Sequence, residues 1–298
     1  MLDYHLHLWP HDQRETPLTI EQLAAYCEKA QAAGVVELAV TEHLFRFRQA
    51  EALLGGFWRD DRIAPQLQES MEEYWDFHAT ADLEAYVACA QEAKDAGLPV
   101  VIGLEVDYYQ GQMDKVAGLL SDYPFDVLLG SVHWLGAWRF DDYEVPVQMA
   151  EWSARQVDDC WEGYTGALEE LAASGVCDVL AHPDLIKVAG FVPDAPEEWW
   201  DRMAEAAASS GMAAEVSSAG WRKPIGEQYP AIPLLQRFAA HDVPFTTASD
   251  AHRLGQVADQ AGAMRSILLD AGVDSLRGFR GRQPHTIPVS PPPETGQG

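Results

Sequence analysis

The chain has 298 residues, enough to bury one large hydrophobic core or two smaller ones. It carries 47 Asp and Glu against 20 Lys and Arg, and this net charge of -27 opposes binding to nucleic-acid phosphates and to anionic membrane surfaces. No apolar run reaches the roughly 18 residues of a membrane span, and the N-terminus lacks the pattern of a signal peptide. We therefore expect a cytoplasmic protein without nucleic-acid or membrane partners; the sequence makes no prediction about its oligomeric state.

Short apolar runs alternate with longer stretches of helical period, which is the pattern of repeated βα units around a parallel sheet. Seven strands are predicted, at residues 2–8, 36–41, 99–105, 125–132, 176–181, 212–216 and 244–248. Helices are predicted at about 19–33, 82–96, 111–120, 148–173, 194–210, 230–240 and 256–271. The expected fold is a single α/β domain over residues 1–280.

Two segments depart from this repeat. Residues 44–81 form an insertion rich in aromatic and charged side chains, which is either a lid that shapes a substrate site or a helical excursion without such a role. Residues 281–298 contain five prolines and no periodicity, so they are expected to form an extended or mobile tail. The four cysteines form no CxxC pair and are expected to be buried free thiols.

Residues that bind metal ions well stand at six of the seven predicted strand exits. In chain order they are His5, His7, His43, Glu105, His133, His182, Asp250 and His252. Catalytic groups of a βα barrel lie at the carboxyl ends of several strands, so we expect these side chains to converge on one face. A single histidine at one exit would more commonly be a hydrogen-bonded core residue, but six histidines and two carboxylates on one face are hard to explain by packing.

The spacing at the first and last exits supports this convergence. His5 and His7 are two residues apart on a strand, so both imidazoles point to the same side. Asp250 and His252 repeat the spacing at the last strand, which neighbours the first strand in a closed barrel. Glu105 ends an apolar run, where a lone buried carboxylate is costly unless a cation lies beside it.

The predicted donors are nitrogen and oxygen atoms without cysteine, which favours Zn²⁺, Mn²⁺ or Fe over a structural thiolate zinc. About eight or nine ligands spread over several strands would serve two or three divalent ions and leave positions open for water, as catalytic sites do. Paired divalent ions lower the pKa of a shared water and clamp the oxygens of an in-line phosphoryl displacement. The pattern therefore predicts a metal-dependent phosphoesterase.

In their order and spacing, the motifs DYHLH (3–7), TEH (41–43), GLE (103–105), GSVHW (130–134), AHPD (181–184) and SDAH (249–252) resemble those of the PHP (polymerase and histidinol phosphatase) superfamily. The resemblance covers nearly the whole chain and implies a distorted (β/α)7 barrel of the TIM type with a trinuclear metal site. It implies one ion held by His5, His7, Glu105 and Asp250, and a second held by Glu105, His133 and His182. A third would take His43, His252 and either His11 or Asp12, because His11 lies closer to HLH than the usual ligand does.

Residues 216–230 (VSSAGWRKPIGEQYP) and the aromatic loop after GSVHW resemble histidinol-phosphate phosphatases within this superfamily. This implies hydrolysis of L-histidinol phosphate to L-histidinol and phosphate, a step of histidine biosynthesis. Arg222 is then expected to bind the substrate phosphate through two hydrogen bonds, with Lys223 nearby, although the two could instead be a solvated loop pair. Ser217-Ser218 stands where the family usually has Asn-Thr, a departure that bears on substrate contacts.

Several residues are thus assigned roles, and others are not. The expected catalytic residues are Glu105, Asp250, His252 and Arg222, and the expected substrate-binding residues are Arg222, Lys223, Arg46 and Trp134. The remaining histidines, His78, His241 and His285, are assigned no part in the site. The proton for the leaving alkoxide could come from Asp250, His252 or a metal-bound water.

Two alternatives to a histidinol phosphatase remain open at this point. One keeps the metal site and changes the substrate to a nucleotide, a small phosphodiester or phosphotyrosine. The other is a non-catalytic module that metal ions stabilise and that binds a partner.

Overall fold

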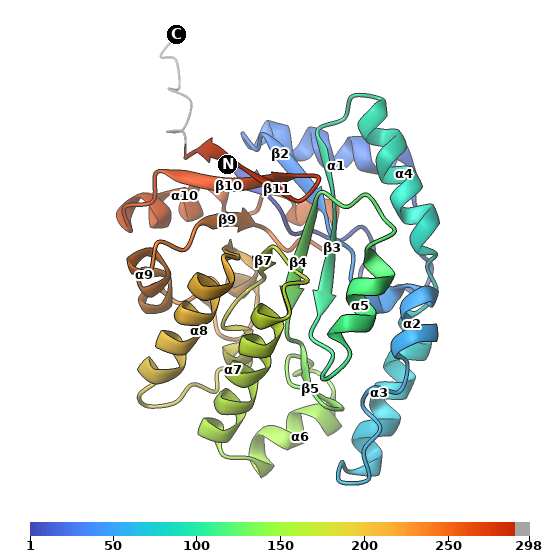
Figure 1. Cartoon of the computed structure of the whole chain (residues 1–298), viewed down its shortest axis with the longest axis vertical. Helices are drawn as coiled ribbons and strands as arrows, with labels where there is room; N and C mark the ends of the chain where they lie inside the picture. The colour runs from blue at the N-terminus through green and yellow to red at the C-terminus, as the bar shows by residue number, and fades with distance from the viewer. Residues whose placement is uncertain (290–298) are drawn as a thin grey trace.

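Seven parallel strands follow one another around a sheet in the order β1-β2-β3-β4-β7-β8-β9 in the computed structural model, which describes residues 1–289 (Figure 1). They are β1 (Leu2–Asp3), β2 (Glu37–Val40), β3 (Val100–Asp107), β4 (Val127–Ser131), β7 (Val179–Leu180), β8 (Ala213–Ser217) and β9 (Phe245–Ala248). The two ends of the sheet meet, because the Tyr4 amide donates to the Thr247 carbonyl (2.9 Å) and the Asp250 amide to the His5 carbonyl (2.8 Å). The expected distorted (β/α)7 barrel is confirmed.

Helices join the strands and pack around the outside of the barrel. They are α1 (Ile20–Ala32), α2 (Arg48–Leu54), α3 (Pro65–His78), α4 (Leu83–Asp95), α5 (Met113–Leu120), α6 (Pro146–Ala154), α7 (Val157–Ala173), α8 (Glu197–Ser210), α9 (Ile232–Ala240) and α10 (Ala261–Asp270). Short 3-10 helices occur at η1 (Leu44–Arg46), η2 (Leu185–Lys187), η3 (Ala219–Arg222) and η4 (Leu254–Gln256). Among residues 1–289, no helix combines the length and the apolar character that crossing a membrane requires.

Local sequence explains where several helices begin. The Thr19 side chain accepts a hydrogen bond from the Gln22 amide (3.2 Å) at the start of α1, and Asp82 accepts one from Ala85 (3.0 Å) at the start of α4. The helix predicted at 148–173 is instead two helices, α6 and α7, because the backbone at Arg155 is extended (φ -112°, ψ 159°).

The four cysteines are free thiols.

The insertion forms η1, α2 and α3. In Figure 1, α3 and α6 lie near the end of the barrel toward which the arrows of β3 and β4 point. A small hairpin of β5 (Trp134–Leu135) and β6 (Trp138–Arg139) connects this region to the barrel. The Arg139 guanidinium donates to the Ser70 carbonyl at 2.8 Å and lies 4.4 Å from the centre of the Tyr74 ring, so it holds α3 against the hairpin.

The first part of the segment expected to be an extended or mobile tail is a paired β-strand. Residues 283–288 form β11 (Gln283–Pro288), antiparallel to β10 (Ser275–Arg280). This hairpin covers the amino-terminal end of the barrel, where the Phe279 amide donates to the Tyr4 hydroxyl (3.1 Å) and Arg282 pairs with Asp178 (2.9 Å). Proline is tolerated in β11 because the strand lies at an edge. The rest of the expected tail, residues 290–298, lies outside the described residues.

Gly103 allows β3 to pass close to both of its neighbours. A Cβ atom at this position would lie 2.7 Å from Cγ2 of Thr41 and 2.9 Å from Cγ1 of Val127. All eight residues of β3 are buried, so these side chains have little room to move. The close approach of β3 to its two neighbouring strands therefore occurs two residues before Glu105.

We therefore expect Gly103→Ala to lower the free energy of unfolding by about 1–3 kcal/mol through overpacking. Gly118→Ala is the matched control, because Gly118 is exposed in α5 and no neighbouring atom lies within 4 Å of an added Cβ. Alanine favours a helix over glycine, so this variant should raise the free energy of unfolding by about 0.5–1 kcal/mol. Urea denaturation of the two variants measures both changes. Equal stability of the two variants would contradict the packing argument.

Candidate metal centre and substrate cavity

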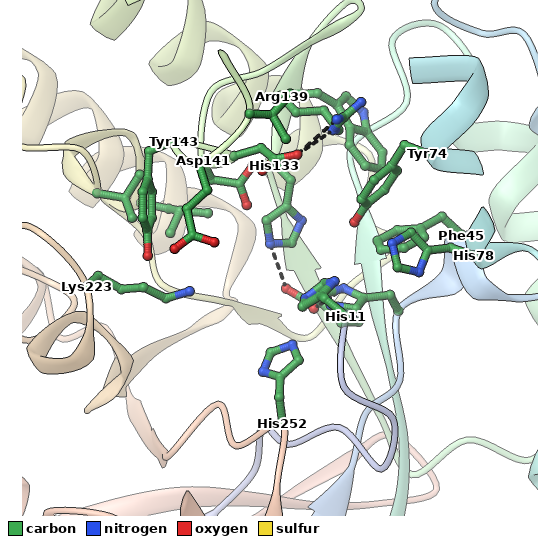
Figure 2. A pocket seen from close by; sticks show the side chains of 18 of the residues that line it. His11, Phe45, Tyr74, His78, His133, Arg139, Asp141, Tyr143, Lys223 and His252 are labelled. Atoms are coloured by element: carbon green, nitrogen blue, oxygen red, sulfur yellow. Dashed lines mark hydrogen bonds and ion pairs between the residues drawn. The ribbon is translucent and has the colours of Figure 1, made fainter. Parts of the chain in front are cut away.

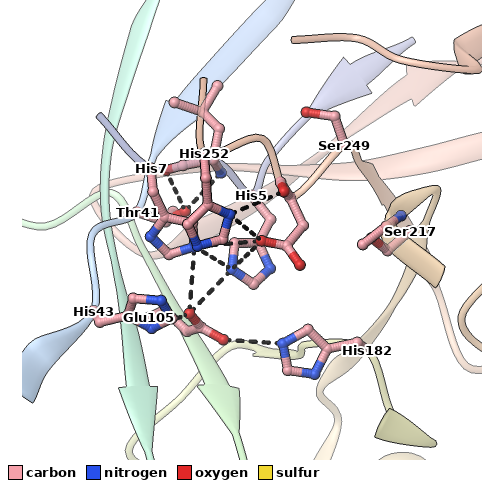
Figure 3. Close-up of polar contacts among 12 residues, drawn as sticks. His5, His7, Thr41, His43, Glu105, His182, Ser217, Ser249 and His252 are labelled. Carbon is pink, nitrogen blue, oxygen red and sulfur yellow. Dashed lines mark hydrogen bonds and ion pairs between the residues drawn. The ribbon is translucent and has the colours of Figure 1, made fainter. Parts of the chain in front are cut away.

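The eight imidazole and carboxylate side chains expected at six strand exits converge at the carboxyl-end mouth of the barrel. Figure 3 labels six of them, namely His5, His7, His43, Glu105, His182 and His252. Their ligand atoms form overlapping groups in which all atoms lie within 4.8 Å of one another. The groups are His5-His7-Asp250, His5-Glu105-His182, His7-His43-His252 and His43-Asp107-His133. The convergence expected from the sequence is therefore present, and Asp107 joins it.

Glu105 lies at the centre of this cluster and is completely buried. Its Oε1 lies 3.0 Å from Nε2 of His182 and 3.4 Å from Nε2 of His133. Its Oε2 lies 2.6 Å from Nδ1 of His43 and 3.2 Å from Nε2 of His5. The two oxygens thus face two different sets of imidazoles, which is the arrangement that a bridging carboxylate between two cations requires.

His5, His7 and Asp250 form a second focus beside Glu105. Nε2 of His7 lies 3.2 Å from Nε2 of His5 and 3.5 Å from Oδ1 of Asp250. Two imidazole nitrogens at this distance need a proton or a metal ion between them. Both Asp250 (φ 49°) and His182 (φ 28°) have positive φ angles, which are uncommon for non-glycine residues.

The two candidates from the loop after HLH take different positions. The ring of His11 lies 4.5 Å from that of His252 and 5.1 Å from that of His43, centre to centre. The Asp12 carboxylate is 72% exposed and pairs with Arg253 at 2.9 Å. The geometry therefore favours His11 over Asp12 as the partner of His43 and His252.

A second layer of carboxylates lies behind the imidazoles. Oε2 of Glu215 lies 2.8 Å from Nδ1 of His5, and its Oε1 accepts a hydrogen bond from the His182 amide (3.1 Å). Oδ1 of Asp107 lies 2.5 Å from Nδ1 of His133. Such contacts fix the ring orientation, so that the opposite nitrogen faces the cluster and becomes a better ligand.

Sequence reasoning missed this second layer, although each member left a signal. Asp107 follows Glu105 by two residues, so it points to the same side of β3. Glu42 lies directly before a predicted ligand, and its Oε2 is 3.6 Å from Nδ1 of His7. Glu215 is the single acid in the apolar run of the sixth strand, the one exit that supplies no predicted ligand.

The cluster is electrostatically coupled. Burial alone would raise the pKa of Glu105, but the imidazoles of His5 and His43 outweigh it and hold that pKa well below its usual range. Burial alone would lower the pKa of His133, but Glu105 and Asp107 raise it to about 10. Glu105 therefore stays anionic at neutral pH and raises the pKa values of His5 and His133. Protons and metal ions compete for the same nitrogens, so low pH weakens metal binding.

The cluster fits divalent cations. Among residues 1–289, two of its buried ring nitrogens have no hydrogen-bond partner, namely Nε2 of His43 and Nε2 of His252. Buried polar atoms without partners are rare in proteins and point to a missing ion or water. Imidazole nitrogens and carboxylate oxygens together suit Zn²⁺, Mn²⁺ and Fe.

A cavity of about 530 Å³ opens over the cluster. Phe45, Tyr74 and His78 of the insertion line one side, and Asp141 and Lys223 lie on another (Figure 2). The structure thus favours the interpretation of residues 44–81 as a segment that shapes a substrate site. It also adds His78 to the cavity wall, which the sequence did not indicate.

Two of the four expected substrate-binding residues line this cavity, namely Lys223 and Trp134. Arg46 does not, because it is fully buried and donates to the carbonyls of Trp9 (3.1 Å) and Pro10 (3.0 Å). These contacts fix the loop that carries His11. Arg46 therefore supports the site from behind.

Arg222 does not line the cavity either, in contrast to the expectation that it binds phosphate. Its guanidinium donates to the carbonyls of Ser249 (2.6 Å) and Asp250 (3.0 Å) and pairs with Asp259 at 3.0 Å. Arg222 of η3 therefore connects the turn at Ser249 and Asp250 with Asp259, which follows η4. The guanidinium stabilises the left-handed turn that carries Asp250.

Comparison with known proteins agrees with the fold and the motifs. Residues 5–219 match the PHP domain family. A probable histidinol-phosphatase of Deinococcus radiodurans is 33% identical over 260 residues, which cover 86% of this chain and 88% of the relative.

Two solved structures share the fold. The putative histidinol phosphatase of Listeria monocytogenes has a TM-score of 0.71 and 18% identity, over 88% of this chain and 99% of its own. The histidinol phosphate phosphatase of Lactococcus lactis was solved in complex with zinc, L-histidinol and phosphate. It has a TM-score of 0.65 and 19% identity, and the match covers 95% of this chain and 98% of its own. With the family match spanning most of the barrel and the Deinococcus relative aligned over nearly its whole length, this chain belongs to the PHP domain family.

Proposed function

We propose that this chain is a metal-dependent phosphomonoesterase that hydrolyses L-histidinol phosphate to L-histidinol and phosphate. The observation that carries the proposal is the cluster of nine potential metal ligands at the base of a cavity of about 530 Å³. The name of the Deinococcus relative and the ligands of the Lactococcus structure support the choice of substrate.

The contacts around Glu105 and His252 support three ion positions, which regroup the side chains of the cluster and add His11. His5, His7, Glu105 and Asp250 would hold one ion, and Glu105, His133 and His182 a second. His43, His252 and His11 would hold the third. Bound Zn²⁺, Mn²⁺ or Fe would activate water for attack on phosphorus and neutralise the charge on the phosphoryl oxygens.

Two cationic side chains, Arg139 and Lys223, line the cavity of this strongly acidic chain, and Arg139 is already paired with Asp142. The ammonium group of Lys223 points into the cavity on the side of His252 (Figure 2) and forms no ion pair within residues 1–289. A phosphate between this group and the metal cluster would gain charge-assisted hydrogen bonds. Screening limits the repulsion by distant acidic residues to about 8 Å in physiological salt, so local cations dominate.

The proton that the leaving alkoxide needs would come from the cavity side of the cluster. His252 and Asp250 line the cavity, and their side chains are 20% and 12% exposed, whereas the side chains of Glu105 and His5 are completely buried. Nδ1 of His252 lies 3.5 Å from Oδ1 of Asp250. A proton can therefore pass between this pair and a substrate oxygen without entering the buried part of the cluster.

The aromatic wall suits the rest of the substrate. Phe45, Tyr74 and Trp134 line the cavity together with His78. An imidazole ring can stack on such side chains and gain dispersion energy.

The first test measures phosphate release from L-histidinol phosphate. The purified protein should catalyse it, a chelator should abolish it, and Zn²⁺ or Mn²⁺ should restore it. Glu105→Gln should reduce both bound metal, measured by elemental analysis, and activity to background, because the variant loses the bridging charge. Glu69→Gln, an exposed change in α3, is the control and should retain both.

The same assay should include a nucleoside monophosphate, bis(p-nitrophenyl) phosphate and phosphotyrosine. A higher kcat/KM for one of these would replace histidinol phosphate as the substrate. A protein that holds no metal, and hydrolyses none of the esters after metal is added, would instead indicate a binding module.

Lys223→Met should raise the KM for L-histidinol phosphate by about 10-fold or more and leave the metal content unchanged. The reason is the loss of a charge-assisted hydrogen bond to the substrate phosphate, worth about 1.5–3 kcal/mol. Steady-state kinetics and elemental analysis on the same preparation measure both. An unchanged KM would remove Lys223 from the phosphate site.

We also propose that Arg222 is a positioning residue for Asp250. Arg222→Ala should weaken metal binding by about 10- to 100-fold, as the loss of other supporting contacts does, and this is measured by metal retained after dialysis. Arg237→Ala, which removes a surface pair with Asp201, is the control and should leave metal retention unchanged. Full metal retention with a raised KM in Arg222→Ala would instead support direct phosphate binding.

A further inference from the structure

The cavity is lined by more carboxylates than the metal cluster uses. The seven are Asp12, Glu73, Glu105, Asp141, Asp142, Glu144 and Asp250. Glu105 and Asp250 belong to the cluster, and Glu73 and Glu144 are exposed to bulk water. Such water screens an exposed carboxylate and weakens its attraction for a ligand.

Two more of these carboxylates already have cationic partners. Asp12 pairs with Arg253 at 2.9 Å. Asp142 accepts two hydrogen bonds from Arg139, at 3.2 and 2.9 Å, and Arg139 itself is tied to the backbone of Ser70. Neither carboxylate is available to a ligand without breaking an ion pair.

Asp141 differs from the other six carboxylates that line the cavity. It is half-buried, and within residues 1–289 its carboxylate forms no hydrogen bond and no ion pair. Figure 2 shows it pointing into the cavity beside Tyr143. Burial raises the pKa of Asp141, which reflects the free energy lost when a carboxylate leaves water without a partner.

The loop that carries Asp141 is held firmly. Phe140, the residue before it, is buried, and its carbonyl accepts a hydrogen bond from Nε1 of Trp152 (3.1 Å). On its other side, Asp142 is fixed by Arg139. A carboxylate on so constrained a backbone is suited to selecting a ligand by geometry.

We propose that Asp141 binds the ammonium group of the substrate and so makes the enzyme selective for phosphate esters of amino alcohols. This rests on the proposed phosphatase function. Lys223 and Asp141 both face the cavity without forming an ion pair with each other (Figure 2). A zwitterionic ester can place its phosphate against Lys223 and the metal cluster and its ammonium against Asp141. A simple alkyl phosphate leaves Asp141 unpaired.

The test compares two esters that differ only in the amine, L-histidinol phosphate and 3-(imidazol-4-yl)propyl phosphate. The wild-type protein should show a higher kcat/KM for the amine-bearing ester. Asp141→Asn should lower the ratio of the two kcat/KM values by about 10- to 100-fold, the range expected for loss of one charge-assisted contact. Glu144→Gln removes the same charge from the same loop and should leave the ratio unchanged.

A second pair, phosphoethanolamine and ethyl phosphate, separates this proposal from the proposed substrate. If wild-type protein prefers phosphoethanolamine and Asp141→Asn removes that preference, Asp141 is the ammonium site even where L-histidinol phosphate is not hydrolysed. Protein that hydrolyses none of the four esters overturns both proposals.

Two results overturn the Asp141 proposal alone. One is an unchanged ratio of the two kcat/KM values in Asp141→Asn, including the case in which kcat/KM falls equally for both esters of a pair; Asp141 would then support the site without contacting the ammonium group. The other is an equal loss of that ratio in Glu144→Gln, which would indicate a general field of the acidic loop. Thermal melting and metal content of Asp141→Asn, compared with wild type, show that the variant is folded and loaded.

Discussion

The burial of the Glu105 carboxylate among imidazoles is the interaction on which the rest of the site depends. A charge at this depth is unfavourable unless polar or charged partners surround it, and the imidazoles of His5, His43, His133 and His182 do so from four other strand exits. Parallel strands bring their carboxyl ends to one face, so residues far apart in the chain can share one centre. The barrel therefore creates a buried site that binding of cations would stabilise.

A second layer of carboxylates determines which way two of the imidazoles, those of His5 and His133, face. Glu215 and Asp107 contact the outer nitrogens of His5 and His133, so the inner nitrogens point toward Glu105. Neither carboxylate contacts the cavity, and both are completely buried. Their contribution is to orientation, and it explains why a strand without a ligand of its own, β8, still shapes the centre.

Two loops outside the barrel repeat convert this centre into a substrate site. The insertion brings aromatic side chains over the cluster, and the loop after β6 brings Asp141 and its neighbours (Figure 2). Arg139 joins the two loops through Ser70 and Tyr74. The metal ligands are thus assembled by the barrel, whereas selectivity for the organic part of a substrate depends on these additions.

The sequence by itself determined the βα barrel and the set of ligand candidates, because strand periodicity and the position of His, Asp and Glu at strand exits are local properties. The tertiary structure alone decided the partners. Arg222 and Lys223 are adjacent and chemically similar, yet one holds the backbone of Asp250 and the other faces the cavity. Likewise, only Asp142 of two adjacent aspartates meets Arg139. Which of two neighbouring charges finds a partner depends on loops that meet in space, and periodicity carries no information about such meetings.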